Sequence, residues 1–400
     1  MTDGEQGPER RRERPAVARF VALVLAILTG CWAVAGVLAA PALPGGLGTA
    51  AAAWALLTLV PLTLFIGIRA LGRYPGTLVR VLVFRPMWYA QLTIVLLAPL
   101  GLAVALVGLP FGDAGAAGRA ALGAGGALLA LAAVAGYVGS RRLEVARLTA
   151  VLPGLPDAVE GLVVAQISDL HVGPQTSPRF LARVAAAVRT AGPELIAVTG
   201  DLVDDFPADA DRYAAAFGDL RAPLGVFAIP GNHEVYSGWA DLRPRLEALP
   251  LTVLVNRSVV VRRAGGTFVV AGTGDPAAPP GAEAAPDVAA SLSRAPAGAF
   301  VLALAHNPAL WPALAARGVP LTLSGHTHWG QLAFPRWGWC LASPFLELAM
   351  GRHERDGRLL YIHPGTNYWG IPFRLGHAAQ VAIITLRRGQ KAELRLETAG

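Results

Sequence analysis

The chain has 400 residues, two cysteines and a formal net charge of +7 at pH 7. Hydrophobic residues make up 54% and charged residues only 15%, which excludes a soluble globular protein over the whole length. Cys31 and Cys340 lie too far apart in sequence to suggest a disulfide framework or a cysteine-based zinc site. A chain of this length predicts two structural units.

The excess positive charge lies in the first 150 residues. Residues 1–150 carry 13 Arg and six acidic residues, whereas residues 151–400 carry 21 Lys plus Arg and 21 acidic residues. Arginines beside apolar stretches are a membrane-topology signal. The neutral second part argues against a long surface that follows a nucleic-acid backbone, so nucleic acid is not an expected partner.

Four apolar stretches in residues 1–150 are long enough to cross a bilayer, which takes about 20 residues each. They lie near 19–40, 48–68, 87–109 and 117–139. A cleaved signal peptide and a buried soluble helix are alternatives for the first stretch, which follows the basic segment RRRERPAVAR. The three further stretches favour a multi-pass membrane anchor.

The arginines of this region fall in alternate loops. The N-terminal tail, the loop between the second and third stretches and the segment after the fourth all carry arginines, whereas PALPGG and PFGDAGAAG carry none. Positive residues stay on the cytoplasmic side of a membrane. The pattern predicts a multi-pass cell-membrane protein with both termini and residues 151–400 in the cytoplasm. The extracytoplasmic side is the alternative if one stretch does not insert.

Residues 151–400 alternate short apolar runs with helical stretches, which predicts buried strands in βαβ units. Strands are expected at 162–168, 194–199, 225–230, 299–305 and 320–324, and helices near 178–191, 209–221 and 239–248. In such sheets, chemistry gathers at the carboxyl ends of the strands. Those ends are therefore the expected place of a functional site.

Each of the five expected strands ends in Asp, Asn or His. The residues are Asp169 and His171, Asp201, Asn232 and His233, His306, and His326 and His328. A lone Asp of this kind is usually a turn residue, but five such strand ends together predict a metal site. Asp, Asn and His ligands without a thiolate suit Mn, Fe or Zn. Asp201 is the expected bridge between two metal ions, because a carboxylate has two oxygens and its strand lies between the other two early ligand strands.

The stretch LSGHTHWGQ, residues 323–331, places two histidines one residue apart. In an extended backbone, residues i and i+2 share a face, so His326 and His328 are expected to point the same way and to reach adjacent ions. The small Gly325 is expected to allow the backbone to approach closely.

These motifs resemble the calcineurin-like metallophosphoesterase superfamily. The order DLH, GDLVD, GNHE, H and GHTH follows its five-block signature, and AQISDLHVG, GNHEVYSG and GTNYWGIPFRLG are similar to the membrane-anchored YkuE/YaeI-like bacterial phosphoesterases. The resemblance covers about residues 160–370. It implies an α/β fold, a four-layer α/β/β/α sandwich with two mixed sheets, in residues 151–400. An all-α transmembrane region of about four helices in residues 1–150 would precede it.

The resemblance also implies roles for the site residues. Asp169, His171, Asp201 and His328 would hold one divalent metal ion, and Asp201, Asn232, His306 and His326 would hold the other. His233 would be the catalytic residue beside the phosphate, and not a ligand. Two divalent ions beside two carboxylates leave a positive site, which favours a phosphate group as substrate.

The expected reaction is hydrolysis of a phosphoester at the membrane by a metal-bridging hydroxide. A diester and a lipid-linked pyrophosphate are both candidate substrates. A non-catalytic, membrane-anchored metal-binding sensor or scaffold and a nuclease are the alternative functions. The sequence makes no prediction of the oligomeric state.

Two further groups of residues have open interpretations. The segment 329–348 holds three tryptophans, Trp329, Trp337 and Trp339, which predicts either contact with the membrane interface or packing over the second sheet. The acids Asp204, Asp205 and Glu234 are expected either to orient metal ligands or to be turn caps or solvated charges. The remaining histidines are predicted to be structural or surface groups, namely His353, His363 and His377.

Overall fold

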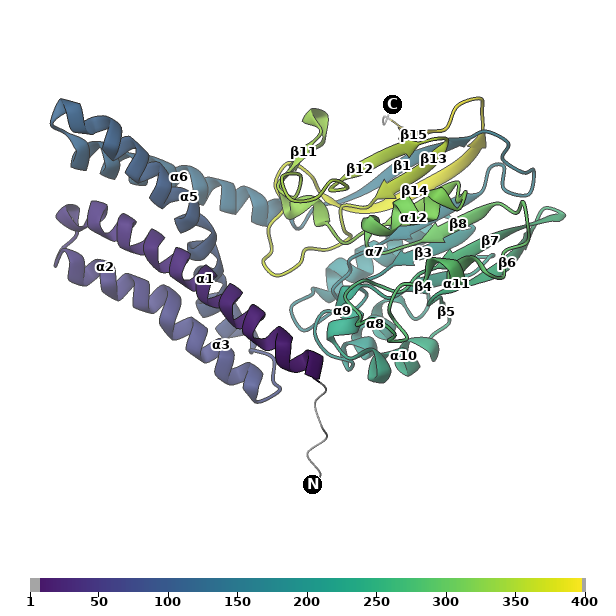
Figure 1. Cartoon of the computed structure of the whole chain (residues 1–400), viewed down its shortest axis with the longest axis horizontal. Helices are drawn as coiled ribbons and strands as arrows, with labels where there is room; N and C mark the ends of the chain where they lie inside the picture. The colour runs from purple at the N-terminus through teal and green to yellow at the C-terminus, as the bar shows by residue number, and fades with distance from the viewer. Residues whose placement is uncertain (1–7, 398–400) are drawn as a thin grey trace, which may run out of the picture. The chain divides into compact units, whose positions relative to one another are not determined.

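The computed structural model describes residues 8–397 and divides the chain into two compact units, Met1–Val134 and Ala135–Gly400. The first unit is helical, and the second contains two β-sheets with helices on their outer faces (Figure 1). The side chains of the N-terminal arginines that carry part of the topology prediction lie outside the described part of the chain.

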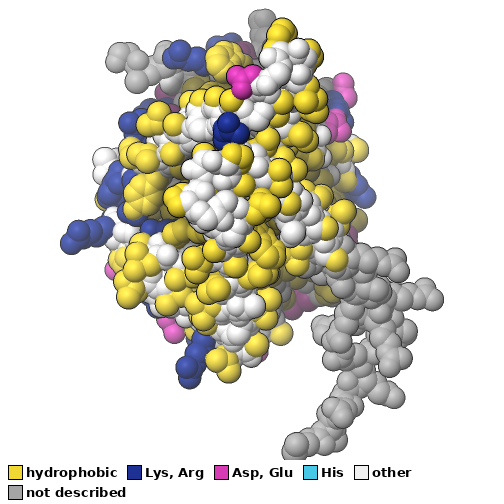
Figure 2. Space-filling model, turned by 90° about the vertical axis from the view of Figure 1, so that its left-hand side faces the viewer, with side chains coloured by type: hydrophobic (Ala, Val, Ile, Leu, Met, Phe, Trp, Pro, Cys, Tyr) yellow, Lys and Arg dark blue, Asp and Glu magenta, His cyan; other side chains and the backbone are white. Residues whose placement is uncertain are grey.

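Four helical stretches are long and apolar enough to cross a membrane: Ala22–Ala42, Leu47–Ile68, Thr77–Phe111 and Ala114–Gly139. They contain helices α1 (Pro8–Ala39), α2 (Leu47–Trp54), α3 (Val60–Ala70), α4 (Thr77–Val79), α5 (Arg85–Gly108) and α6 (Ala114–Gly139). Large apolar side chains on these helices are exposed, and the face drawn in Figure 2 is mostly hydrophobic. Lipid suits such a surface and water does not, so the expected group of four long apolar helices is confirmed.

The second unit contains a seven-stranded and a six-stranded mixed sheet. The strands of the first are β1 (Leu143–Leu152), β2 (Val163–Ile167), β3 (Leu195–Thr199), β4 (Val226–Ile229), β5 (Thr252–Val253), β14 (Ala379–Arg388) and β15 (Glu393–Leu396). Those of the second are β6 (Arg257–Arg263), β7 (Gly266–Gly272), β8 (Val301–Leu304), β9 (Leu321–Ser324), β12 (Gly351–Arg355) and β13 (Arg358–Ile362). The orders are β15-β1-β14-β2-β3-β4-β5 and β12-β13-β9-β8-β7-β6.

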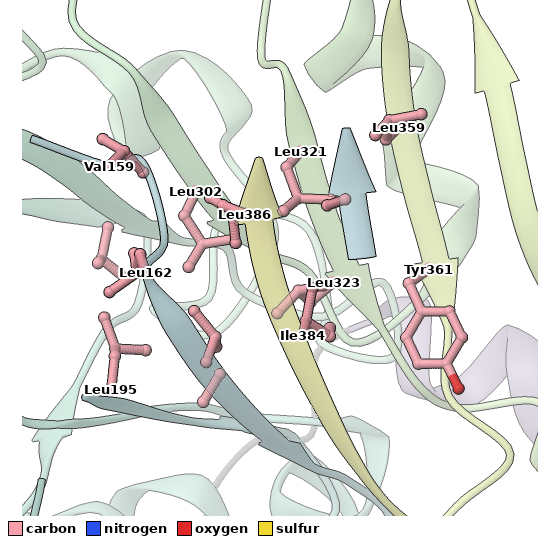
Figure 3. Close-up of a cluster of buried hydrophobic side chains, with 14 of the residues drawn as sticks. Val159, Leu162, Leu195, Leu302, Leu321, Leu323, Leu359, Tyr361, Ile384 and Leu386 are labelled. Atoms are coloured by element: carbon pink, nitrogen blue, oxygen red, sulfur yellow. The ribbon is translucent and has the colours of Figure 1, made fainter. Parts of the chain in front are cut away.

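Alternate residues of each central strand pack on opposite faces of its sheet. Between the sheets, Leu195 of β3 lies in one core cluster with Leu302 of β8 and Leu323 of β9 (Figure 3). On its outer face, the first sheet packs against α7 (Pro178–Ala191), α8 (Asp209–Phe217) and α10 (Trp239–Glu247). The second sheet packs against α11 (Val288–Leu292) and α12 (Trp311–Ala316). The expected four-layer α/β/β/α sandwich is therefore confirmed.

The five expected strands are β2, β3, β4, β8 and β9. Within each sheet these strands run parallel to one another. Near their carboxyl ends, polar side chains replace the leucines between the sheets. The amide of Gln166 donates to Thr199 Oγ1 at 2.9 Å and to the carbonyl of Ser324 at 2.9 Å, which joins β2 and β3 to β9. These bonds fix the two sets of strand ends against each other, and the loops that follow them meet at the candidate site.

Candidate metal centre

One group of buried donors joins the loop after β2 to the turn after β9. His328, at the start of the turn η6 (His328–Gln331), has its Nε2 3.3 Å from Asp169 Oδ1 and 2.9 Å from His171 Nε2. All three side chains are buried. The three donor atoms lie close enough together to hold one metal ion.

A second group comes from the ends of β3, β4, β8 and β9. His306 Nε2 lies 3.3 Å from Asp201 Oδ2 and 3.1 Å from the side-chain oxygen of Asn232. Nδ1 of His326 lies 2.8 Å from the same Asn232 oxygen. Asn232 begins the short helix α9 (Asn232–Tyr236). These four residues are the set that the resemblance assigned to the second ion.

Asp201 lies between the two groups. Its Oδ2, already next to His306, is 3.7 Å from Nε2 of His171 in the first group. Asp169, Asp201 and His306 also offer donor atoms close enough for a single ion. A side chain in this position has the geometry expected of a bridge between two ions.

The backbone is left-handed at five of the predicted ligands. The φ angles are 54° at Asp169, 42° at His171, 52° at Asp201, 72° at His326 and 48° at His328. Non-glycine residues rarely adopt this conformation, which costs about 1–3 kcal/mol each and occurs mainly at functional sites. The surrounding sandwich therefore holds these five residues in place against their local preference.

The expected extended conformation of His326-Thr327-His328 is wrong. Both histidines have positive φ, because the chain turns sharply as soon as β9 ends at Ser324. The two rings consequently belong to different groups. His328 contacts Asp169 and His171, whereas His326 contacts Asn232.

Two glycines allow the ligand loops to approach each other. A Cβ on Gly325 would lie 2.3 Å from Asp169 Oδ2, and one on Gly231 would lie 2.2 Å from Asp201 Oδ1. Real Cβ atoms do not approach other atoms this closely. The backbone of Gly325 thus lies directly against the carboxylate of Asp169, and Gly231 is a second position of the same kind.

Glu234 ties together the loops after β3 and β4. Its fully buried carboxylate accepts hydrogen bonds from the backbone N–H groups of Asp201, Val203 and Gly231, at 2.8, 3.0 and 2.7 Å. Glu234 therefore orients the backbone of Asp201 and, through its bond to Gly231, also caps the start of α9, so both interpretations hold for this acid. The motif GNHE looks the same whether its glutamate is buried in this way or exposed to solvent at the start of a helix. The sequence therefore did not single out this role.

Asp204 lies behind two histidines of the site. Its Oδ1 is 3.7 Å from Nδ1 of His171 and 3.9 Å from Nδ1 of His233, and its carbonyl accepts a hydrogen bond of 2.6 Å from His233 Nδ1. Burial, together with the neighbouring half-buried Asp205, raises the pKa of Asp204 to about 7. Asp204 thus orients the ring of His233.

Sequence reasoning missed Arg374, which supports the first ligand loop from behind. This buried side chain donates to the carbonyls of Pro364, Gly365 and Asn367. The amide of Asn367 in turn donates to the carbonyl of Leu170 at 2.9 Å, between two of the ligands. A single arginine in an apolar stretch gives no recognisable signal of such a role.

The histidines outside the motif blocks do not reach the donor groups. His363 is fully buried, and its Nδ1 accepts the N–H of Gly365 at 3.0 Å. His377 lies 3.2 Å from Arg374, and His353 contacts the carbonyl of Met350. All three have structural contacts of this kind, as predicted.

The charges of the donors suit divalent cations. Burial lowers the pKa of His171 to about 3, that of His326 to about 4 and that of His328 well below its usual value. Neutral imidazoles are the form that binds metals. Burial opposes the charged form of His306 as well, but the carboxylate of Asp201 outweighs it and raises the pKa of His306 far above normal.

In the described part of the chain, the buried carboxylates of Asp169 and Asp201 form no ion pair with a lysine or an arginine. Burial raises the pKa of Asp169 to about 6, whereas His306 outweighs burial at Asp201 and holds its pKa well below normal. Among the described residues, their ion pairs are with histidines alone. Asp169 Oδ2 is buried without a hydrogen-bond partner, as is Nδ1 of both His171 and His328. A donor set of Asp, Asn and neutral His fits Mn, Fe or Zn.

Aromatic side chains flank His233. Its ring centroid is 4.5 Å from that of His171, 5.8 Å from Tyr236 and 6.1 Å from Trp369. Tyr236 is 69% exposed and Trp369 is 54% exposed. Two accessible aromatic rings, of Tyr236 and Trp369, therefore border His233.

Comparison with known proteins agrees with the geometry. Residues 162–330 match the calcineurin-like phosphoesterase family. A transmembrane protein with metallophosphoesterase domain from Danio rerio is 31% identical over 249 residues, 58% of this chain and 55% of that protein. An uncharacterized metallophosphoesterase of Aquifex aeolicus is 29% identical, over 61% of this chain and 92% of that protein. The metallophosphoesterase YkuE of Bacillus subtilis is 27% identical, over 63% and 88%.

The chain spans 54–60% of the length of several of its relatives, among them the Danio rerio protein. The family match covers both donor groups. It does not extend to the supporting loop around Asn367 and Arg374. The strand order and the donor geometry agree with this match, and residues 162–330 of this chain are similar to a calcineurin-like phosphoesterase domain.

Proposed function

We propose that the protein is a membrane-anchored, metal-dependent phosphohydrolase with two divalent ions at its centre. The observation that carries this proposal is the position of Asp201 between the two donor groups. Asp169, His171, Asp201 and His328 would hold one ion, and Asp201, Asn232, His306 and His326 the other. When bound, such ions supply Lewis acidity and lower the pKa of coordinated water to about 7.

The residues of the chain orient the donors and hold a proton. Glu234 fixes the backbone of Asp201, and Asn367 fixes the loop that carries Asp169 and His171. A carbonyl can only accept, so Nδ1 of His233 donates its hydrogen to Asp204. This leaves Nε2 of His233 to hold a proton and to release it to the leaving oxygen of a phosphoester.

A rival role exists for His233. Its ring nitrogen lies close enough to donors of His171 and Asp201 to complete a metal-binding set of its own. The hydrogen bond to Asp204 and the aromatic border on its other side favour the role of acid. The two roles differ in whether metal is retained when the ring is removed.

The substrate that we propose is a lipid-linked phosphoester or pyrophosphate. Exposed Tyr236 and Trp369 border His233, and aromatic side chains suit an apolar leaving group. The balanced charge of residues 151–400 does not favour a long polyanion.

We further infer that the catalytic domain lies in the cytoplasm. An even number of spans would leave the segments before the first and after the fourth on one side of the membrane, and the arginine-bearing loops are those predicted to stay inside.

Replacing the bridge should remove both metals. In Asp201→Ala we expect metal content to fall towards zero and turnover to fall by about 10³-fold or more, since bound metals contribute several kcal/mol to the transition state. Elemental analysis and kinetics of the purified full-length protein, reconstituted with Mn²⁺, measure both. Asp209→Ala is the control, because Asp209 is also buried but touches no donor. Normal turnover in Asp201→Ala would end the proposal.

Removal of the proposed acid should separate catalysis from metal binding. His233→Ala is expected to keep both metals and to slow turnover by about 10²–10⁴-fold, the usual contribution of a general acid. The same two measurements apply, with His353→Ala as the control from outside the site. Loss of one metal from His233→Ala would instead make His233 a ligand.

The aromatic border should select the substrate. With Mn²⁺, we expect kcat/KM to be highest for a lipid-linked pyrophosphate in mixed micelles, when compared with a chromogenic diester, nucleotides and DNA. Trp369→Ala should lower kcat/KM for the lipid-linked compound by up to about tenfold, as an aromatic contact contributes about 0.5–1.5 kcal/mol. The chromogenic diester should be affected less. Equal losses on both compounds would reject the lipid-linked class.

The side of the membrane can be read from cysteine labelling in intact cells. In a Cys31→Ala, Cys340→Ala background, exposed Ala215→Cys on α8 should react with an impermeant maleimide only after the membrane is opened. Asp113→Cys, in an arginine-free loop, should react in intact cells. Labelling at 215 in intact cells would place the catalytic domain outside.

A further inference from the structure

The segment Pro335–Leu346, here named the aromatic loop, is folded but apolar on its outside. Beneath it, Ala333, Cys340 and Trp329 are buried in one cluster, and Trp329 Nε1 donates to the carbonyl of Ile362 at 3.0 Å. On its outside, Trp337 is 77% exposed and Phe345 is 81% exposed, and Trp339, Leu341 and Leu346 are exposed too. Trp329 therefore packs over the second sheet, whereas Trp337 and Trp339 do not.

Very little charge accompanies these side chains. Between Leu332 and Leu346 the only charged residue is Arg336, which is exposed at the rim. The short strands β10 (Ala333–Phe334) and β11 (Trp339–Cys340) pair and hold the loop in shape, with the ring of Phe334 5.0 Å from Trp337 and 6.2 Å from Trp339. An ordered apolar patch that nothing in the fold covers marks an interaction surface.

The aromatic loop is joined to the end of the last apolar helix through one backbone segment. Within the second unit, the N–H of Arg374 donates to the carbonyl of Gly136 at 2.8 Å, and a Cβ on Gly136 would lie 2.2 Å from the ring of Phe373. The next residue, Leu375, donates to Gln331 and accepts from Ala333, both at 3.0 Å. Backbone hydrogen bonds of Arg374 and Leu375 thus link the end of α6 to β10, the strand that leads into the aromatic loop.

The end of α6 carries the markers of a membrane surface. The guanidinium of Arg141 lies 4.9 Å from the ring of Tyr137 and donates to its hydroxyl at 2.8 Å, and Arg142 follows. Tyrosines and arginines at the end of a span sit at the level of the lipid headgroups. Phe373 and Arg374 pack against this same turn of the helix.

We propose that the aromatic loop inserts Trp337, Trp339 and Phe345 into the headgroup region of the membrane that the four helices cross. Tryptophan and phenylalanine favour this region, and a rim arginine suits anionic headgroups. Gln331, at the base of the loop, exchanges two hydrogen bonds with the backbone of Trp369, at 3.0 and 2.9 Å. Trp369, which lies beside the candidate metal centre, is therefore hydrogen-bonded to the base of a loop that contacts the lipid surface.

Spin labels on the full-length protein test this without any turnover. In nanodiscs of phosphatidylethanolamine and phosphatidylglycerol, and in a Cys31→Ala, Cys340→Ala background, a label at Phe345→Cys should be relaxed by oxygen more than by a polar nickel chelate. The control is Val260→Cys. Val260 is also apolar and exposed, and it lies on β6, at one edge of the second sheet. The aromatic loop leads into β12, at the opposite edge of that sheet. There the nickel chelate should relax the label more than oxygen does.

Two outcomes would overturn the proposal. Equal oxygen-to-nickel ratios at 345 and 260 would mean that the aromatic loop faces water. Exclusion of both reagents from position 345 would mean that protein, such as a second copy of the chain, covers it. Retention of two metals in both labelled proteins confirms that the substitutions leave the fold intact. Because no substrate is involved, failure here would leave the proposed hydrolysis untouched.

Discussion

Two aspartates buried without a lysine or arginine of their own are the constraint around which this domain is organised. Asp169 and Asp201 lie in the interior, and their ion pairs within the described chain are with histidines. Burying a carboxylate is expensive unless positive charge or several donors compensate for it. Three of the neighbouring histidines are kept neutral by the same burial. Divalent cations are the compensation that this set of donors fits.

The fold supplies the convergence, because ligands far apart in sequence leave from parallel strand ends of two facing sheets. Leucines fill the sandwich, and Gln166 bonds β2 to β3 and β9 where the polar site begins. The five left-handed ligand residues cost free energy locally. Close packing between the sheets and the three hydrogen bonds to Glu234 hold these loops in that conformation. The strain is thus a consequence of bringing five strand ends to one place.

The parts of the fold that sequence could predict were those with a simple pattern. Runs of apolar residues that end in Asp, Asn or His identified β2, β3, β4, β8 and β9 and the residues that converge after them. The strands β1, β14 and β15 were not predicted. In β1, Glu144 and Arg147 lie among apolar residues at an edge of the hydrophobic region, which hides the pattern of a buried strand. The conformation of His326-Thr327-His328 depends on how β9 ends, and Arg374 acts through the backbone carbonyls of an irregular segment seven to ten residues before it. Neither leaves a pattern in a single sequence.

Within the second unit, the same segment that supports the first ligand loop also contacts the last turn of α6. Only residues 140–142 separate α6 from β1, too few for a flexible linker. Gly136 and Gly139 are the positions where helix and segment touch, since a Cβ on Gly139 would lie 2.1 Å from the carbonyl oxygen of Arg374. Arg374 then binds the carbonyl of Asn367, and Asn367 binds that of Leu170, between Asp169 and His171. A shift of the last turn of α6 would therefore reach the first ligand loop through three contacts, all of them between backbone or buried groups.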